Sequence, residues 1–263
     1  MELTKLQVYG RKVIHNYWDI TKNVVTSRLY VVNKGYAWYM LDDKPHILSA
    51  GHLYLFPPLL SLRFKQEPDI PLDHTYLQFI TASLPISKQV IDLPLSDYPT
   101  LNSLVSTFNT FINEYNISPS NHKHDKIVLG YLDLFLSLIR SVYHIPNVSD
   151  KRIEKVVSYI SEHYNEPILV EEMAAMVYLE VNYFIKLFRS IMHVSPHQYL
   201  KDFRLSMASE FLHSGLSIQE TASRVGYSSG YALSAAMKKR WGYSPSALIR
   251  NEKKNSTCSI KNS

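Results

Sequence analysis

Cationic side chains gather near the end of the segment GYSSGYALSAAMKKRWGYSPSALIR, which covers residues 226–250. Lys238, Lys239 and Arg240 follow a run of small and apolar residues that favours a helix. Lys and Arg side chains donate charge-assisted hydrogen bonds to phosphate oxygens, so this grouping is suited to the backbone of a nucleic acid. A solvated basic helix would have the same composition. The segment therefore predicts one of these two structures, and its surroundings must decide between them.

The net charge of +5 is unevenly distributed along the chain. Residues 1–150 contain 13 Lys or Arg and 13 Asp or Glu, whereas residues 151–263 contain 15 and 10. A neutral N-terminal part joined to a basic C-terminal part indicates that only the second part meets a polyanion.

Histidine and cysteine are the residues that would indicate a metal centre. Such a site needs three or four convergent ligands, and a His-x-His pair on a strand often begins one. The pair formed by His122 and His124 falls in a predicted loop, and His46, His52 and His74 fall on separate predicted strands or turns. The chain has one cysteine, which excludes an internal disulfide framework and a cysteine-based zinc cluster. We expect no metal, no cofactor and no catalytic residue.

The same features indicate a location. No apolar run approaches the roughly 20 residues of a membrane span, and the first ten residues lack the pattern of an export signal. A reducing cytoplasm fits the cysteine content best. We expect a cytoplasmic protein without a membrane partner.

The N-terminal part is predicted to be β-rich and then helical. Residues 1–95 contain short apolar and aromatic runs separated by Pro and Gly, which is typical of a sandwich or small barrel. These runs are Val24–Val32, Tyr36–Leu41, Ile47–Leu48, Leu53–Phe56 and His74–Ile80. Residues 96–145 change to the i, i+3, i+4, i+7 spacing of two amphipathic helices. These helices could cover the open edge of the barrel, pack against a second copy of the chain, or do both.

Residues 151–250 are predicted to be helical and contain an internal repeat. Val170, Glu172 and Ala174 recur 48 positions later as Ile218, Glu220 and Ala222. Ser195–Pro196 recurs 49 positions later as Ser244–Pro245. Each copy has the order helix, tight turn, helix and proline-containing stop, which is a helix-turn-helix. A helix over residues 197–213 joins them, and its length of roughly 25 Å is of the order of the 34 Å between successive major grooves.

The two copies differ in their local signals. In the second copy Ser217 and Glu220 form a capping box, Gly226 supplies a positive φ, and Ser228 or Ser229 caps the next helix. In the first copy the turn lacks glycine and Glu180 replaces the serine cap. We therefore expect the first copy to be locally weaker.

The C-terminal part resembles the DNA-binding domain of the AraC/XylS family of transcription regulators. The resemblance lies in YISEHYNEPILVEEMA, LFRS, HVSPHQYL, FRLSMASEFLHSG, SIQETASRVGYSS and WGYSPSALIR. The stretches AGHLYLFPP and PLDHTYLQF resemble the cupin-like barrel of the sugar-responsive members. The implied fold is α+β. It comprises a cupin-like effector-binding barrel over 1–95, a helical dimerisation segment over 96–145, a linker over 146–150, a double helix-turn-helix domain over 151–250 and a flexible basic tail over 251–263.

The resemblance also implies which residues contact DNA. The family's base-contacting positions fall on Asn182, Ile185 and Lys186 in the first copy and on Gly230, Tyr231, Ser234 and Ala235 in the second. Asn suits adenine and Lys suits guanine or phosphate, whereas Ala235 offers no hydrogen bond. We expect the first copy to specify sequence and the second mainly to anchor the protein. Phosphate contacts are expected from Arg189, Lys238, Lys239 and Arg240.

An effector pocket in the barrel is implied by the same family. Carbohydrate is the class suggested, because an aromatic face packs on a sugar ring while polar groups orient its hydroxyls. The candidate residues are Trp18, Trp38, Tyr54, His74 and Tyr76. We expect the effector to change how the barrel or its arm, residues 1–17, contacts the DNA-binding domain or the partner subunit.

The function expected is sequence-specific transcription regulation by a non-enzyme. Its partners would be promoter or operator DNA, a small-molecule effector, a second copy of the chain and, for an activator, RNA polymerase. Two alternatives are a cupin-type metalloenzyme with an attached DNA-binding domain and a ligand-independent regulator whose barrel only dimerises. A DNA-repair adaptor is disfavoured, because no cysteine precedes Cys258.

Overall fold

The computed structural model describes most of the chain, which divides into two compact domains at Asp150. This division falls at the end of the predicted linker. The described residues are 4–14, 20–23, 26–41, 44–58, 60–66, 70–81, 89–115, 122–143 and 150–249. Trp18, most of the linker and the basic tail lie outside them.

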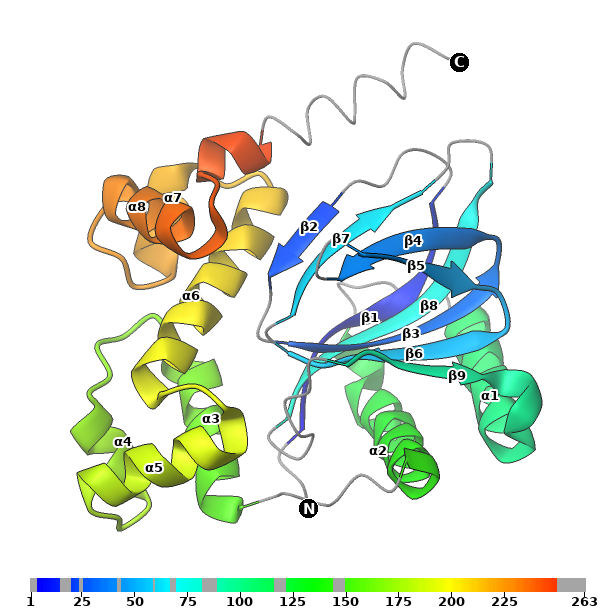
Figure 1. Cartoon of the computed structure of the whole chain (residues 1–263), viewed down its shortest axis with the longest axis horizontal. Helices are drawn as coiled ribbons and strands as arrows, with labels where there is room; N and C mark the ends of the chain where they lie inside the picture. The colour runs from blue at the N-terminus through cyan, green and yellow to red at the C-terminus, as the bar shows by residue number, and fades with distance from the viewer. Residues whose placement is uncertain are drawn as a thin grey trace. The chain divides into compact units, whose positions relative to one another are not determined.

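The described residues of the N-terminal domain form nine strands in two sheets (Figure 1). The five-stranded sheet has the order β1-β8-β3-β6-β9, and the four-stranded sheet has the order β2-β7-β4-β5. The strands are β1 (Lys5–Ile14), β2 (Ile20–Asn23), β3 (Ser27–Lys34), β4 (Tyr36–Leu41), β5 (Lys44–Ser49), β6 (His52–Phe56), β7 (Ser61–Lys65), β8 (Leu72–Ile80) and β9 (Ile91–Pro94).

The two sheets pack face to face through one hydrophobic cluster. Side chains alternate between the faces of a strand, so every second residue of β3, β6 and β8 points between the sheets. Tyr30, Phe56 and Tyr76 do so from the five-stranded sheet, and Tyr39 and Phe64 do so from the four-stranded sheet. We call the space between these faces the inter-sheet interior.

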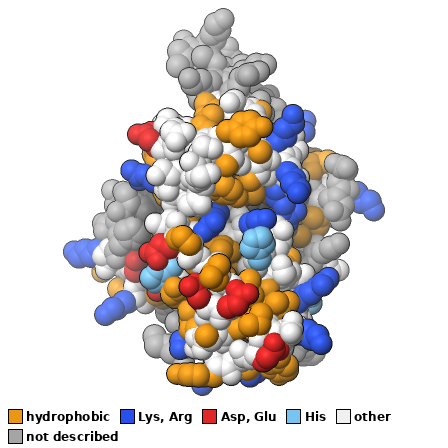
Figure 2. All heavy atoms as spheres, turned by 90° about the vertical axis from the view of Figure 1, so that its left-hand side faces the viewer, with side chains coloured by type: hydrophobic (Ala, Val, Ile, Leu, Met, Phe, Trp, Pro, Cys, Tyr) orange, Lys and Arg blue, Asp and Glu red, His pale blue; other side chains and the backbone are white. Residues whose placement is uncertain are grey.

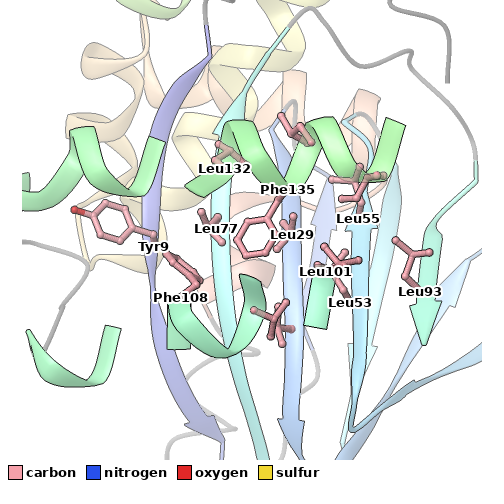
Figure 3. Packing of buried hydrophobic residues seen from close by; sticks show 14 of the residues in the cluster. Tyr9, Leu29, Leu53, Leu55, Leu77, Leu93, Leu101, Phe108, Leu132 and Phe135 are labelled. Atoms are coloured by element: carbon pink, nitrogen blue, oxygen red, sulfur yellow. The ribbon is translucent and has the colours of Figure 1, made fainter. Parts of the chain in front are cut away.

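Two helices cover the other face of the five-stranded sheet. They are α1 (Pro99–Glu114) and α2 (Asp125–Tyr143), and a 3-10 turn over Leu95–Asp97 leads into α1. Figure 3 shows Phe108 of α1 and Phe135 of α2 packed on Leu29 and Leu77 of the sheet. The sequence suggested that these helices cover the open edge of a barrel, contact a second copy of the chain, or do both. In the structure they cover a face of the five-stranded sheet and not an open edge.

Strand β1 is the main element that the sequence reading did not predict. Its ten residues pair antiparallel with β8 from Lys5↔Ile80 to Ile14↔Leu72. Residues 1–17 are predicted as an arm, but residues 5–14 form an edge strand of the five-stranded sheet. Two side-chain contacts of Arg11 hold this strand in place. The guanidinium binds Asp73 of β8 and donates to the Asn113 side chain of α1 at 2.9 Å.

The described residues of the C-terminal domain form six longer helices with a last short turn over residues 245–249. The helices are α3 (Lys151–His163), α4 (Val170–Met176), α5 (Val181–Met192), α6 (Pro196–His213), α7 (Ile218–Arg224) and α8 (Gly230–Trp241). Pairs α4–α5 and α7–α8 are the two predicted helix-turn-helix copies, and α6 is the predicted connecting helix. The predicted range of the connecting helix, 197–213, differs from that of α6 by one residue.

Helix α6 supports both copies from its two ends. Near its N-terminus, Tyr199 packs on Phe188 of α5 with ring centroids 5.7 Å apart. Nearer its C-terminus, Leu205 and Leu212 join Leu233 and Met237 of α8 in one buried cluster. One helix thus serves as the common core element of both copies.

Candidate functional site

Helix α5 begins with a carboxylate cap. The Glu180 side chain accepts a hydrogen bond from the Tyr183 N–H at 3.0 Å. Hydrogen bonds from the backbone N–H groups of Asn182 and Tyr183 hold the pKa of Glu180 below its usual value. The replacement of serine by Glu180 therefore does not leave the helix uncapped, because an anion also suits the positive end of the helix dipole.

Helix α8 begins with two side-chain contacts to its N-terminus. Ser229 accepts a hydrogen bond from the Ala232 N–H at 3.2 Å, so it is Ser229 and not Ser228 that caps the helix. The Gln219 side chain of α7 accepts the Gly230 N–H at 3.0 Å and ties the two helices together. A Cβ at Gly230 would lie 3.2 Å from Gln219 Oε1 and from Ile218 Cγ2, so glycine lets α7 approach closely.

The outer face of α5 carries the polar residues predicted for base contacts. Asn182 and Lys186 are exposed one turn apart, Arg189 continues the same face, and Ile185 is half-buried beside them. The Asn182 Nδ2 donates one of its two N–H groups to Glu180 Oε1 at 3.1 Å, which leaves the second N–H and Oδ1 for an adenine. Lys186 and Arg189 are both exposed cations on this face.

The outer face of α8 offers fewer hydrogen-bonding groups. Tyr231 is 85% exposed and Ala235 is exposed one turn later. The Ser234 hydroxyl donates to the Gly230 carbonyl at 2.7 Å within the helix, which leaves its oxygen free only to accept. Viewed from the side on which these helices lie, Figure 2 shows Lys and Arg side chains interspersed with exposed hydrophobic ones. Among the predicted base-contacting residues of α8, Tyr231 is the one that extends into solvent.

The three cations at the end of α8 are not equivalent. Lys238 and Lys239 are exposed. The Arg240 guanidinium binds Asp202 of α6, with Nε 2.7 Å from Oδ1 and Nη2 3.2 Å from Oδ2. Asp202 is buried, and this ion pair raises the pKa of Arg240. If Arg240 contacts a phosphate, its guanidinium must bind the phosphate and Asp202 at the same time. Lys238 and Lys239 are exposed and do not bind Asp202.

The loop between α3 and α4 is held against the second copy. Arg204 of α6 donates to the carbonyls of Tyr164 and Glu166 at 2.6 and 2.7 Å. A Cβ at Gly226 would lie 2.7 Å from the Asn165 carbonyl oxygen, and Gly226 has φ of 76° as predicted. The turn of the second copy therefore packs against the loop between α3 and α4. Sequence reasoning missed Gln219, Asp202 and Arg204, because each acts on a residue far away in the sequence.

The inter-sheet interior is lined by aromatic rings. Tyr30 lies at its centre, with ring centroids 5.3 Å from Phe56, 5.1 Å from His74 and 6.5 Å from Tyr76. Tyr39 approaches Phe56 from the opposite sheet at 5.4 Å. Such a wall of rings is suited to an organic ligand.

The structure separates the residues predicted for the effector pocket. His74 and Tyr76 face the inter-sheet interior and contact each other, with ring centroids 5.6 Å apart. Tyr54 is also there, but its hydroxyl accepts the Ser49 N–H at 2.9 Å and donates to a carbonyl of β5, so it has a structural role. Trp38 lies between two inward-facing residues of β4 and so points to the outer face of its sheet. Trp18 lies outside the described residues.

Within the described part of the N-terminal domain, His46, His52, His74 and His124 each have an aromatic or acidic neighbour. His46 stacks on Tyr39 at 4.9 Å, and His52 Nδ1 lies 2.7 Å from Asp92 Oδ1. No three His, Cys, Asp or Glu residues are grouped to hold a metal ion within the part of the chain that the structure describes. In that same part, no helix has the length and apolar character needed to cross a membrane.

Comparison with known proteins gives three findings about this architecture. A helix-turn-helix domain family matches residues 173–251. The lactose operon transcription activator of Staphylococcus xylosus is 22% identical over 81% of this chain and 78% of its own length. The raffinose operon transcriptional regulatory protein RafR of Pediococcus pentosaceus is 24% identical over 88% of this chain and 87% of its own length.

A solved structure shares the fold of nearly the whole chain. ToxT from Vibrio cholerae superimposes with a TM-score of 0.61 at 10% identity and covers 92% of this chain and 98% of ToxT. At this identity the likeness concerns the fold, namely an N-terminal domain of sheets followed by a helical C-terminal domain.

Proposed function

We propose that a small molecule bound in the N-terminal domain controls this protein. The chain carries a helix-turn-helix domain of the AraC type and is a DNA-binding transcription regulator of that type. The observation that carries the DNA-binding part is the pair of recognition helices, α5 and α8, set on one connecting helix. Helix α6 has 18 residues and so spans roughly 27 Å, which is of the order of the distance between two major grooves.

Helix α5 is proposed to read bases and α8 to anchor the complex. The base contacts come from Asn182, Ile185 and Lys186 on α5, since Asn and Lys match the major-groove edges of adenine and guanine. On α8 the exposed side chain is Tyr231, whereas Gly230, Ser234 and Ala235 allow close approach. The phosphate contacts come from Arg189, Lys238 and Lys239. Arg240 contributes through the N–H groups of its guanidinium that do not bind Asp202.

The effector is proposed to bind in the inter-sheet interior of a cupin-like N-terminal domain. The aromatic rings around Tyr30, with His74 and Tyr76, supply a surface on which the apolar face of a sugar ring can pack. The names of two relatives, regulators of lactose and raffinose operons, support carbohydrate as the class to test first. The effector must bind the two states of the regulator with different affinity for the switch to work.

Dimerisation is proposed through the outer face of α2. Its inner face packs on the sheet, whereas Ile127 and Leu134 are 49% and 54% exposed seven residues apart. Tyr131 and Leu138 occupy the next heptad positions but are partly buried against the core of the domain, so the exposed apolar side chains of this face are Ile127 and Leu134. Replacement of Leu134 by Lys should shift the mass measured by light scattering from dimer to monomer, whereas replacement of the exposed Ser137 by Lys should not.

The experiment that tests the function is selection of genomic fragments by the purified full-length protein, followed by footprinting of the recovered site. Two protected major grooves on one face of the duplex are expected, with affinity that responds to a carbohydrate related to the neighbouring genes. The matched control replaces Asn182 and Lys186 by Ala, which should abolish selection without unfolding the protein. Recovery of the same fragments by this control would contradict the proposal.

A further inference from the structure

Arg28 of β3 has two buried guanidinium nitrogens, Nε and Nη2, without a hydrogen-bond acceptor. Its side chain is 2% exposed, and its Nε and Nη2 atoms are buried and donate to no atom of the protein. Buried polar groups in folded proteins almost always have a hydrogen-bond partner, and buried charges are paired. The Nε and Nη2 donors of Arg28 therefore lack the acceptor that a buried guanidinium normally has.

The side chain of Arg28 points into the inter-sheet interior. Along β3, Leu29 belongs to the cluster beneath the helices, whereas Tyr30 belongs to the cluster between the sheets. Arg28 shares the face of Tyr30 because strand side chains alternate. Its cross-strand neighbours on that face are Phe56 of β6 and Gln78 of β8. The guanidinium thus lies at one end of the aromatic surface proposed for the effector.

The described residues of the N-terminal domain do not supply the missing anion. The buried carboxylate in this part of the structure belongs to Asp73. Arg11 already binds it, with Nε 2.8 Å from Oδ1, and Asn33 donates to the same oxygen at 3.3 Å. Two residues before Arg28, the buried Thr26 hydroxyl also has no hydrogen-bond partner. The described residues thus offer no acceptor for Nε and Nη2 of Arg28, and a bound molecule could supply one.

The chemistry of the surroundings defines the class of that molecule. A guanidinium presents parallel N–H donors that match the two oxygens of a carboxylate. A single cation balances a single negative charge, which favours a carboxylate over a phosphate dianion. The rings of Tyr30, Phe56 and Tyr76 would contact the uncharged remainder of the molecule.

We propose that Arg28 binds the carboxylate of a small organic acid in the inter-sheet interior, so that the effector of this regulator is an anion rather than a neutral sugar. This inference rests on the proposed function, in which the same interior holds the effector. A sugar acid would satisfy both the aromatic surface and the guanidinium.

The first test compares matched acids and neutral molecules by thermal unfolding of the full-length protein. The probes are galacturonate with galactose, hexanoate with hexanamide, and glucose 6-phosphate with glucose. We expect at least one carboxylate to raise Tm by about 5 °C or more at saturation. Its neutral counterpart should not, and Arg28→Met should remove the response. A response to the phosphate alone, or to none of the acids, overturns the carboxylate assignment.

The second test needs no ligand and uses a matched control. Arg28→Met replaces an unpaired buried charge with an apolar side chain of similar length, so Tm of the ligand-free protein should stay equal or rise. Arg11→Met removes the partner of buried Asp73 and should lower Tm by several degrees. A fall in Tm for Arg28→Met as large as that for Arg11→Met shows that Arg28 has a structural role and overturns the proposal.

Operator binding separates this inference from the proposed function. Arg28→Met should still bind operator DNA while losing its response to the acid. If galactose instead alters operator binding equally in the wild type and in Arg28→Met, effector control stands and the assignment of an anion is wrong.

Discussion

The two helix-turn-helix copies share a backbone path but achieve it with different residues. Tyr178 and Gly226 occupy the same position in the two turns, with φ of 55° and 76°. His193 and Gly242 end α5 and α8 in the same left-handed conformation, with φ of 53° and 81°. Glycine adopts this conformation without steric cost, whereas Tyr and His do not. The second copy therefore has the unstrained version of each turn.

The copies also differ in what surrounds the turn. Gly226 packs against the Asn165 carbonyl, whereas Tyr178 is 94% exposed. The second turn is thus fixed by the rest of the domain, and the first is fixed mainly by its own caps and its buried Phe184 and Phe188. The copy with the larger set of side chains proposed for base contacts is therefore also the one whose turn depends less on the rest of the domain.

The largest expected effect is on the second turn. Gly226→Ala places a Cβ 2.7 Å from the Asn165 oxygen in a left-handed conformation, so the free energy of unfolding should fall by about 3 kcal/mol or more. Gly242→Ala meets no atom within 4 Å and should cost only about 1–2 kcal/mol. Tyr178→Gly should change stability by less than about 1 kcal/mol. Urea titration of the three variants measures this, and equal losses would remove the difference between the turns.

The next effect concerns specificity. Lys186→Ala should lower discrimination between the operator and a site with one altered base pair by about 1–3 kcal/mol. Ala235→Arg should raise affinity for both sites, because α8 contributes anchoring. Binding isotherms for the two duplexes at one salt concentration measure it. If Ser234→Ala costs as much discrimination as Lys186→Ala, both helices read sequence and the division between them fails.

A smaller effect separates the cations of α8. Lys239→Ala should reduce the slope of log K against log salt concentration by about 1 without affecting stability. Arg240→Met removes the cation that pairs with buried Asp202 and leaves it the hydrogen bond from Gln198, so the free energy of unfolding should also fall. The fall should be only about 1–3 kcal/mol, because the Arg240 side chain is 46% exposed. Salt titrations of DNA binding and urea titrations are needed together. A stable Arg240→Met variant would show that Asp202 does not depend on this pair.

The smallest effect is on the helix caps as pH falls. The folded-state pKa of Glu180 is below its ordinary value of 4.5, so its cap stabilises α5 above that value and is lost as pH falls through the lowered pKa. Ser229 does not titrate in this range. The amide proton resonance of Tyr183 should therefore move between pH 5 and 3 by NMR, whereas that of Ala232 should not. Parallel movement of both would indicate general acid unfolding.

Much of the C-terminal domain could be predicted from its sequence. Ser217, Gly226 and Ser229 are local signals whose meaning depends on a few neighbouring residues, so they located α7, the turn and α8. The repeat at 48 and 49 residues then located α4 and α5. The family comparison agrees with that reading.

The N-terminal domain was less predictable, because its sheet depends on long-range pairing. Strand β1 pairs with residues more than 50 positions away, and its own sequence lacks a clear alternation. The same holds for the aromatic residues considered for the proposed effector site. Tyr39 and Trp38 are adjacent aromatic residues, and only the pairing of β4 decides which of them faces the interior.

The sequence by itself determined the order of the helices, the position of the two turns and the class of protein, because capping residues, glycines and hydrophobic spacing act over a few residues. The tertiary structure decided which charges are available. The sequence does not distinguish among Lys238, Lys239 and Arg240. In the structure Arg240 forms an ion pair with buried Asp202. Arg28 is an ordinary strand residue in the sequence, but the packing of two sheets leaves its Nε and Nη2 atoms buried and without an acceptor. Burial and partners at long range set the energy of a charge, and neither is present in the local sequence.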